Sequence, residues 1–265
     1  MPGPAPARRG RRRLAVSLVF LAAALLSSGY LVLFSPGQVA PDPSATVAAP
    51  ATTAAPPTPS PEPPPTTAPP LSLPGDFPTD GPGEVRYARG TGEEIGSEGR
   101  LVRFRVAVET NIDEDPGEVA RFIEATLKDP RGWTADGRTR FQRVPGDAAH
   151  EVTVSLVTSG TAARMCATAG LDIIGTGLPD GGLSCHYSGQ VVLNLSRWRM
   201  SVPEYVAAKV PLERYRQMVV NHEIGHALGY GHEGCPGPGE LAPVMQQQSI
   251  SLDGCRPNPW PFPDE

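Results

Sequence analysis

Runs of apolar residues mark three predicted strands. The run at residues 101–108 alternates large and variable side chains in its later half, and the runs at 151–157 and 190–195 are rich in valine and leucine. A period of two and an enrichment in β-branched residues are typical of strands. We therefore expect three strands here, with a glycine-rich, cysteine-containing stretch between the second and the third.

A helical spacing of apolar residues follows the first predicted strand. Asp115 is a suitable N-cap, Pro116 suits the first helical position, and Glu118 adds a negative charge to the first turn. The apolar stripe consists of Val119, Phe122, Ile123 and Leu127. These signals predict an amphipathic helix that begins directly after Asp115.

A second helix is predicted from about Pro211 to Gly229. Its apolar stripe continues without a break into His222 and His226, and a glycine is well suited to end a helix. Strands combined with two main helices in an incomplete alternation predict an α+β domain.

The first 34 residues have the pattern of a membrane anchor. Five arginines precede an uncharged run at residues 14–34, which is long enough to span a bilayer as a helix. We predict a cytoplasmic segment at 1–13, a single-pass transmembrane signal anchor at 14–34 and an extracellular remainder in contact with the membrane only through that helix. A cleaved signal peptide is the alternative and would release a secreted protein, but Pro41 makes the nearest small-residue site a poor one.

Proline, alanine, threonine and serine dominate residues 35–74, which carry almost no charge. Such a segment buries too little apolar surface to offset its ordering entropy, so we predict a disordered linker that tethers the domain. Residues 75–265 are numerous enough for one domain with its own core. Removing the five N-terminal arginines from the net charge of −5 leaves −10 beyond residue 34, which argues against nucleic acid as a partner.

Four cysteines lie in the predicted domain, and an even number in an exported chain favours disulfides. We prefer the pairs Cys166–Cys185 and Cys235–Cys255 because each closes a short loop, while the other two connectivities stay open. The rival interpretation makes Cys235 a metal ligand, since it follows His232 by three residues.

The run from His222 to His232, which reads HEIGHALGYGH, has the residues of a metal site. His222 and His226 are four residues apart and therefore share one helix face. Gly229 allows the chain to reverse, so that His232 can become the third ligand. Three imidazoles leave a fourth position for water, as in catalytic zinc sites, and Glu223 is then placed to act as the general base. Ordinary helix histidines are the alternative, and the complete spacing argues against them.

The same run resembles the signature of the metzincin clan of zinc endopeptidases. The resemblance implies a twisted mixed sheet and a methionine turn, for which Met245 in the run APVM is the candidate, as an apolar floor beneath the zinc. More narrowly, the run GHALGYGHEGCPGPG, followed by APVMQQQ, resembles an uncharacterised family of actinobacterial exported proteins known only as a domain of unknown function. That narrower resemblance extends over most of the region from about Tyr87 to the end of the chain.

Clan members bind substrate as an extended strand, so the resemblance implies a cleft beside residues 182–187. His186 and Tyr187 are then candidates for lining the cleft. Gln247 stands where several clan families have an assisting tyrosine, and it could donate a hydrogen bond to a developing oxyanion. For all three residues a surface position without a functional role is an equally good interpretation.

The leading hypothesis is a membrane-anchored extracellular zinc endopeptidase that hydrolyses peptide bonds of a peptide or protein substrate. One alternative is a zinc amidase that acts on cell-wall peptide or acetylated sugar. Another is a binding module in which zinc only stabilises the fold. The sequence makes no prediction about the natural substrate or the oligomeric state.

Overall fold

The computed structural model describes residues 68–178 and 181–264. The predicted cytoplasmic segment, the predicted transmembrane helix and most of the predicted linker lie outside these residues. Within the described ranges, no helix is both long enough and apolar enough to cross a membrane. The described chain combines a mixed β-sheet with helices and therefore has the predicted α+β class.

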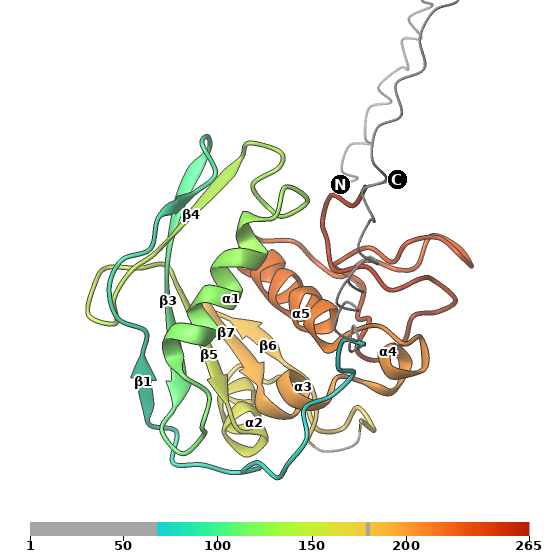
Figure 1. Ribbon diagram of the computed structural model, residues 1–265, viewed down its shortest axis with the longest axis horizontal. Helices are drawn as coiled ribbons and strands as arrows, with labels where there is room; N and C mark the ends of the chain where they lie inside the picture. Colours follow the sequence, from blue (N-terminus) through green and yellow to red (C-terminus); the bar gives the residue numbers. More distant parts are fainter. Residues whose placement is uncertain (1–67, 179–180, 265) are drawn as a thin grey trace, which may run out of the picture. The chain divides into compact units, whose positions relative to one another are not determined.

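A mixed sheet forms the centre of the fold (Figure 1). Its strand order is β2-β4-β3-β5-β7-β6, and β1 pairs with the end of β3. Parallel pairing joins β4, β3, β5 and β7 in succession, whereas β1, β2 and β6 pair antiparallel. The strands are β1 (Val85–Tyr87), β2 (Glu94–Ile95), β3 (Arg100–Glu109), β4 (Thr139–Arg143), β5 (Val152–Val157), β6 (Cys185–Tyr187) and β7 (Gln190–Asn194). The three predicted strands are confirmed as β3, β5 and β7.

The predicted start of the first helix is confirmed. The Asp115 carboxylate accepts hydrogen bonds from the backbone N–H groups of Gly117 at 2.9 Å and Glu118 at 3.0 Å. The second predicted helix is also present, as α5. The helices are α1 (Pro116–Lys128), α2 (Ser159–Ala167), α3 (Leu195–Met200), α4 (Pro203–Ala207) and α5 (Leu212–Ala227).

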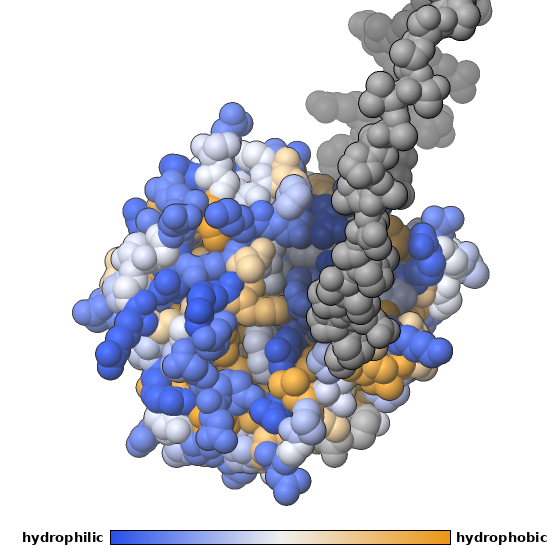
Figure 2. Space-filling model, in the orientation of Figure 1, coloured by the Kyte–Doolittle hydropathy of each residue, from blue (hydrophilic) through white to orange (hydrophobic). Residues whose placement is uncertain are grey.

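Helices cover both faces of the sheet near its centre. α1 and α5 lie on the near face in Figure 1, whereas α2 packs against β6 and β7 from the other face. Alternate residues of β7 therefore enter two separate apolar clusters, with Val191 and Leu193 on the α5 face and Val192 on the α2 face. Hydrophilic side chains cover most of the surface in view in Figure 2, with hydrophobic ones in scattered patches.

The apolar pattern does not predict α2, which is short and composed mostly of small or polar residues. Its start is stabilised instead by tertiary contacts with Glu109, whose side chain is fully buried. The Glu109 carboxylate accepts hydrogen bonds from the Thr158 N–H at 2.8 Å and from the Thr161 hydroxyl at 2.6 Å. Burial raises the pKa of Glu109, but these hydrogen bonds, with one from Gly83, outweigh it and lower the pKa below its usual value.

Both preferred disulfides, Cys166–Cys185 and Cys235–Cys255, are present. The first joins α2 to β6, and the second braces the region beyond α5. Disulfides are typical of chains in an oxidising compartment such as the cell exterior. Because Cys235 is disulfide-bonded, it is not a metal ligand.

Packing of the domain begins before the expected boundary at Gly75. The carbonyl of Pro70 accepts a hydrogen bond from the Leu212 N–H at 2.9 Å, at the start of α5. The Leu73 N–H donates to the Arg199 carbonyl at 2.8 Å, and the Leu73 side chain packs against the main core. These apolar and backbone contacts tie the last residues of the proline-rich stretch to the helices.

Candidate metal centre

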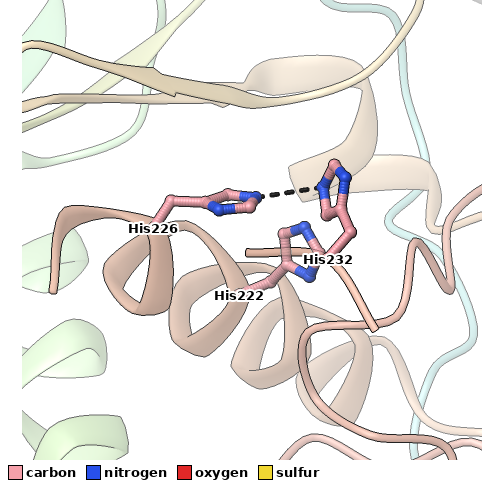
Figure 3. Close-up of side chains that lie close together, drawn as sticks. All are labelled: His222, His226 and His232. Carbon is pink, nitrogen blue, oxygen red and sulfur yellow. Dashed lines mark hydrogen bonds between the residues drawn. The ribbon is translucent and has the colours of Figure 1, made fainter. Parts of the chain in front are cut away.

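The end of α5 brings three histidines together. His222 and His226 lie one turn apart on the same face of the helix, as their spacing predicts. The chain leaves the helix through Gly229, which has a φ of 98°, a left-handed conformation that favours glycine. This reversal places His232 beside the two helix histidines, as Figure 3 shows.

The three rings converge in Figure 3, and their candidate ligand atoms lie within 4.8 Å of one another. The closest pair consists of the Nε2 atoms of His226 and His232, which are 3.1 Å apart. His222 is the most buried of the three, and His232 is exposed. The group could therefore hold a metal ion that is reached from one side.

Backbone carbonyl groups orient the two helix histidines. His222 Nδ1 lies 2.8 Å from the Val244 carbonyl oxygen, and His226 Nδ1 lies 2.9 Å from that of Tyr230. A carbonyl oxygen only accepts hydrogen bonds, so each Nδ1 carries the proton and each Nε2 keeps a lone pair. Metal-bound histidines have this arrangement of outer hydrogen bonds, so the residues present fit a metal ion.

Met245 lies beneath the helix between the two ligands. Its side chain is 1 % exposed, and a β-carbon added at Gly225 would overlap its sulfur atom. The same added atom would lie 2.8 Å from the Trp133 ring. Gly225 therefore allows the methionine and the tryptophan to pack tightly against α5, and the turn that supplies Met245 also supplies the Val244 carbonyl that holds His222.

Glu223 is buried beside the histidines. It is 5 % exposed, and its Oε2 atom has no hydrogen-bond partner among residues 68–178 and 181–264. Burial raises the pKa of Glu223 to about 8. A divalent cation held nearby would oppose this shift, because an opposite charge favours the ionised carboxylate.

Burial also affects the histidines. It lowers the pKa of His222 to about 4, an effect that the charges of His226 and His232 reinforce and the hydrogen bond to Val244 opposes. The pKa of His232 is lowered as well, first because its ring is partly desolvated within an otherwise exposed side chain and then by the charge of His226. Both shifts favour the neutral ring, which is the form that binds metal ions.

A cavity of about 520 Å³ opens over the histidines and Glu223. One wall comes from α5, where the buried residues Met218 and Val219 line the cavity together with His222. The facing wall comes from residues 170–173 and 183–184 together with β6, and a third side comes from residues 247–250. The apolar and polar residues that line these two sides include Leu171, Ile173, Leu183, Ser184, His186, Gln247, Ser249 and Ile250.

Comparison with known protein families gives one match. The family model described as a protein of unknown function, DUF3152, matches residues 72–263. The chain belongs to this family. No curated protein and no solved structure matches the chain. The DUF3152 description assigns no activity, so a function for this member has to be argued from its site.

Two of the three candidate substrate-contacting residues, His186 and Gln247, line the cavity, and Tyr187 does not. His186 lines the cavity, and its ring is nearly parallel to that of His226, at 19°, with the ring centroids 6.4 Å apart. Burial, and then the charge of His226, lowers the pKa of His186. Tyr187 does not line the cavity, because it packs on the opposite face of the sheet with Cys166 and Cys185. Gln247 lines the cavity with an exposed side chain.

Several residues that support this DUF3152 site were not predicted from the sequence. Trp133 donates a hydrogen bond from Nε1 to the Asn221 carbonyl at 2.9 Å, and its ring stacks on that of Tyr230 with centroids 4.6 Å apart. Trp133 lies 88 positions before Asn221 in the sequence. No local pattern in the sequence relates two such distant positions.

Proposed function

We propose that this protein is a metzincin-like zinc endopeptidase that cleaves peptide or protein substrates outside the cell. One observation carries the proposal: three histidine nitrogens that could bind one ion share a cavity with a buried glutamate whose Oε2 has no partner among the described residues. A closed structural metal site has no use for such a carboxylate. The cavity over this group has a volume of about 520 Å³.

Zinc is the ion that this donor set suits best. Three imidazoles with no carboxylate or thiolate in the group are typical of catalytic zinc, and the outer hydrogen bonds to Val244 and Tyr230 orient two of them. When bound, zinc supplies Lewis acidity, which polarises a carbonyl group and lowers the pKa of a water molecule.

Glu223 would act as the general base and then as the general acid. The carboxylate takes a proton from water as the water oxygen bonds to the carbonyl carbon of the scissile peptide. It gives that proton to the amide nitrogen as the C–N bond breaks. The products are one peptide with a new carboxyl group and one with a new amino group, and Glu223 returns to its starting state.

Further features support the metzincin-like assignment. Met245 packs under the helix between the ligands, as an apolar floor would, and an antiparallel strand, β6, ends the mixed sheet beside α5. The two disulfides support an extracellular location. Attachment to the membrane through residues 14–34 is part of the proposal and rests on the sequence alone.

The test compares the full-length wild type with Glu223→Gln. Each protein is purified in detergent, its zinc content is measured, and cleavage of a peptide library is followed with and without a chelator. We expect one equivalent of zinc in both proteins, chelator-sensitive cleavage by the wild type, and a loss of about 10²- to 10⁴-fold in kcat for the variant. Glu213→Gln is the matched control, since Glu213 lies on the exposed first turn of α5, and it should cleave like the wild type.

Undiminished cleavage by Glu223→Gln would disprove the assigned role. Zinc binding without cleavage of any library peptide would reject the endopeptidase, and digestion of purified cell-wall material in the same series would then identify an amidase.

A further inference from the structure

The pleat of β6 directs His186 towards the metal centre. β6 pairs antiparallel with β7, and His186 lies opposite Val191, which belongs to the core cluster on the α5 face. Its neighbours Cys185 and Tyr187 pack on the α2 face. Since side chains alternate along a strand, His186 is the one residue of this short strand that faces α5. Figure 1 shows β6 beside that helix.

The Cys166–Cys185 disulfide holds β6 on the face opposite to the His186 side chain. That bond joins the preceding residue of β6 to α2, and both of its cysteines are buried. On the other side of His186, the turn at Ser188 and Gly189 leads directly into β7. The ring is therefore presented to the cavity by a strand that is held on its opposite face.

The His186 ring has a buried polar atom without a partner. Its Nε2 atom is shielded from solvent and has no hydrogen-bond partner among the described residues. An unpaired buried donor or acceptor costs on the order of 1–3 kcal/mol and calls for an explanation. His186 lines the same cavity as Glu223 and the three histidines, so a small rotation of its ring on substrate entry would let this nitrogen pair with a substrate group.

His186 is not one of the grouped metal ligands. The set of side chains that could hold an ion consists of His222, His226 and His232 alone among residues 68–178 and 181–264. The centroid of the His186 ring lies 6.4 Å from that of His226. His186 is therefore near the metal centre but outside its ligand set, on the wall that faces α5.

We propose that His186 is a catalytic residue that donates a hydrogen bond from its ring to the substrate oxygen that becomes negative as water adds to the scissile carbonyl. This inference rests on the proposed function. No proton changes hands in this step: the proton of the water goes to Glu223, and the electron pair of the C=O double bond moves to the oxygen that accepts the hydrogen bond. A donor in a water-shielded site stabilises such a charge more strongly than one in water.

The structure favours His186 over Gln247 for this role. The Gln247 side chain is exposed, so solvent weakens any hydrogen bond that it donates. The His186 side chain is half-buried, and the disulfide at the preceding residue holds its strand in place. We therefore expect His186 to contribute much more than Gln247 to stabilisation of the negative oxygen.

The test uses His186→Phe in the full-length protein, because phenylalanine keeps a ring and removes the donor. We expect kcat to fall by about 10²- to 10³-fold, with KM within about twofold of the wild type. Affinity for a peptide phosphinate, whose tetrahedral anionic group mimics the transition state, should fall by a similar factor in calorimetry. Zinc affinity and the melting temperature should not change, and Tyr187→Phe, on the other face of the strand, should match the wild type throughout.

Three other results would contradict the proposed role of His186, and each leads to a different conclusion. Wild-type kcat and phosphinate affinity in His186→Phe would show that the ring plays no catalytic part, while the proposed function would stand on Glu223→Gln. A tenfold loss of zinc affinity would make His186 a fourth ligand. If the wild type neither cleaves peptides nor binds the phosphinate, both proposals fail together.

Discussion

One wall of the cavity comes from a single run of sequence, whereas the facing wall comes from segments that the sheet brings together. The metal wall consists of α5 and the histidines within eleven consecutive positions, His222 to His232. The facing wall combines β6 with the chain after α2, and its position depends on β7, on Glu109 and on a disulfide. The geometry of the metal ligands therefore depends mainly on residues close in the sequence. The positions of the residues in the facing wall depend on contacts between distant parts of the fold.

This difference predicts that the two walls can be damaged separately. A change that loosens the facing wall should alter peptide turnover and leave zinc affinity unchanged. A change in the packing beneath α5 should instead lower zinc affinity first. The following experiments compare the two walls in the full-length protein, in order of decreasing expected effect.

Removal of each disulfide in turn should give the largest difference between the two walls in their effects on turnover and zinc affinity. The double variant Cys166→Ala, Cys185→Ala opens a loop with a sequence separation of 19, and we expect the free energy of unfolding to fall by about 3 kcal/mol. Peptide turnover should fall with it, because β6 loses its support, while zinc affinity stays at the wild-type value. Denaturant titration, turnover and zinc competition measure the three quantities.

The pair Cys235→Ala, Cys255→Ala is the matched control, since its separation is 20. It should lose a similar amount of stability, but here zinc affinity should fall, because Cys235 follows His232 by three residues. Equal losses of zinc affinity in both double variants would contradict the independence of the walls.

Glu109→Gln tests the support of α2. The variant loses a charged acceptor of several hydrogen bonds, so we expect a decrease of about 2–3 kcal/mol in the free energy of unfolding at pH 7. The pKa of Glu109 is lower in the folded chain than its usual 4.5, so its contribution is complete above that value and is lost as the pH falls through the folded pKa.

Denaturant titrations of the wild type and Glu109→Gln between pH 3 and pH 7 check this pH dependence. The difference in stability should shrink as the pH decreases, because the wild-type carboxyl group then becomes protonated. A difference that is constant over the whole range would show that the Glu109 carboxylate contributes no pH-dependent stability.

Gly225→Ala tests the packing beneath the metal wall. The added methyl group would overlap Met245 and approach Trp133, so we expect a loss of about 1–3 kcal/mol in stability and a measurable loss of zinc affinity. Gly234→Ala is the matched control, since a β-carbon there meets no atom within 4 Å. Wild-type zinc affinity in Gly225→Ala would mean that this packing does not hold the ligands in place.

Much of the helical structure could be predicted from local signals. The cap at Asp115 and the apolar stripe of α1 act within a few residues of one another, as does the unbroken stripe of α5. α2 escaped prediction because it is stabilised by Glu109, which lies 49 positions before Thr158, and by a disulfide. β4 and β6 are short, and their pairing partners rather than their own residues define them.

The sequence by itself determined the grouping of His222, His226 and Glu223, because a helix places His226 one turn after both, four residues from His222 and three from Glu223. It also determined the reversal at Gly229, since glycine adopts a left-handed conformation at little cost. Only the tertiary structure decided which of two neighbouring residues, His186 or Tyr187, faces the cavity. The pairing register sets that choice, and a shift of one residue would exchange them.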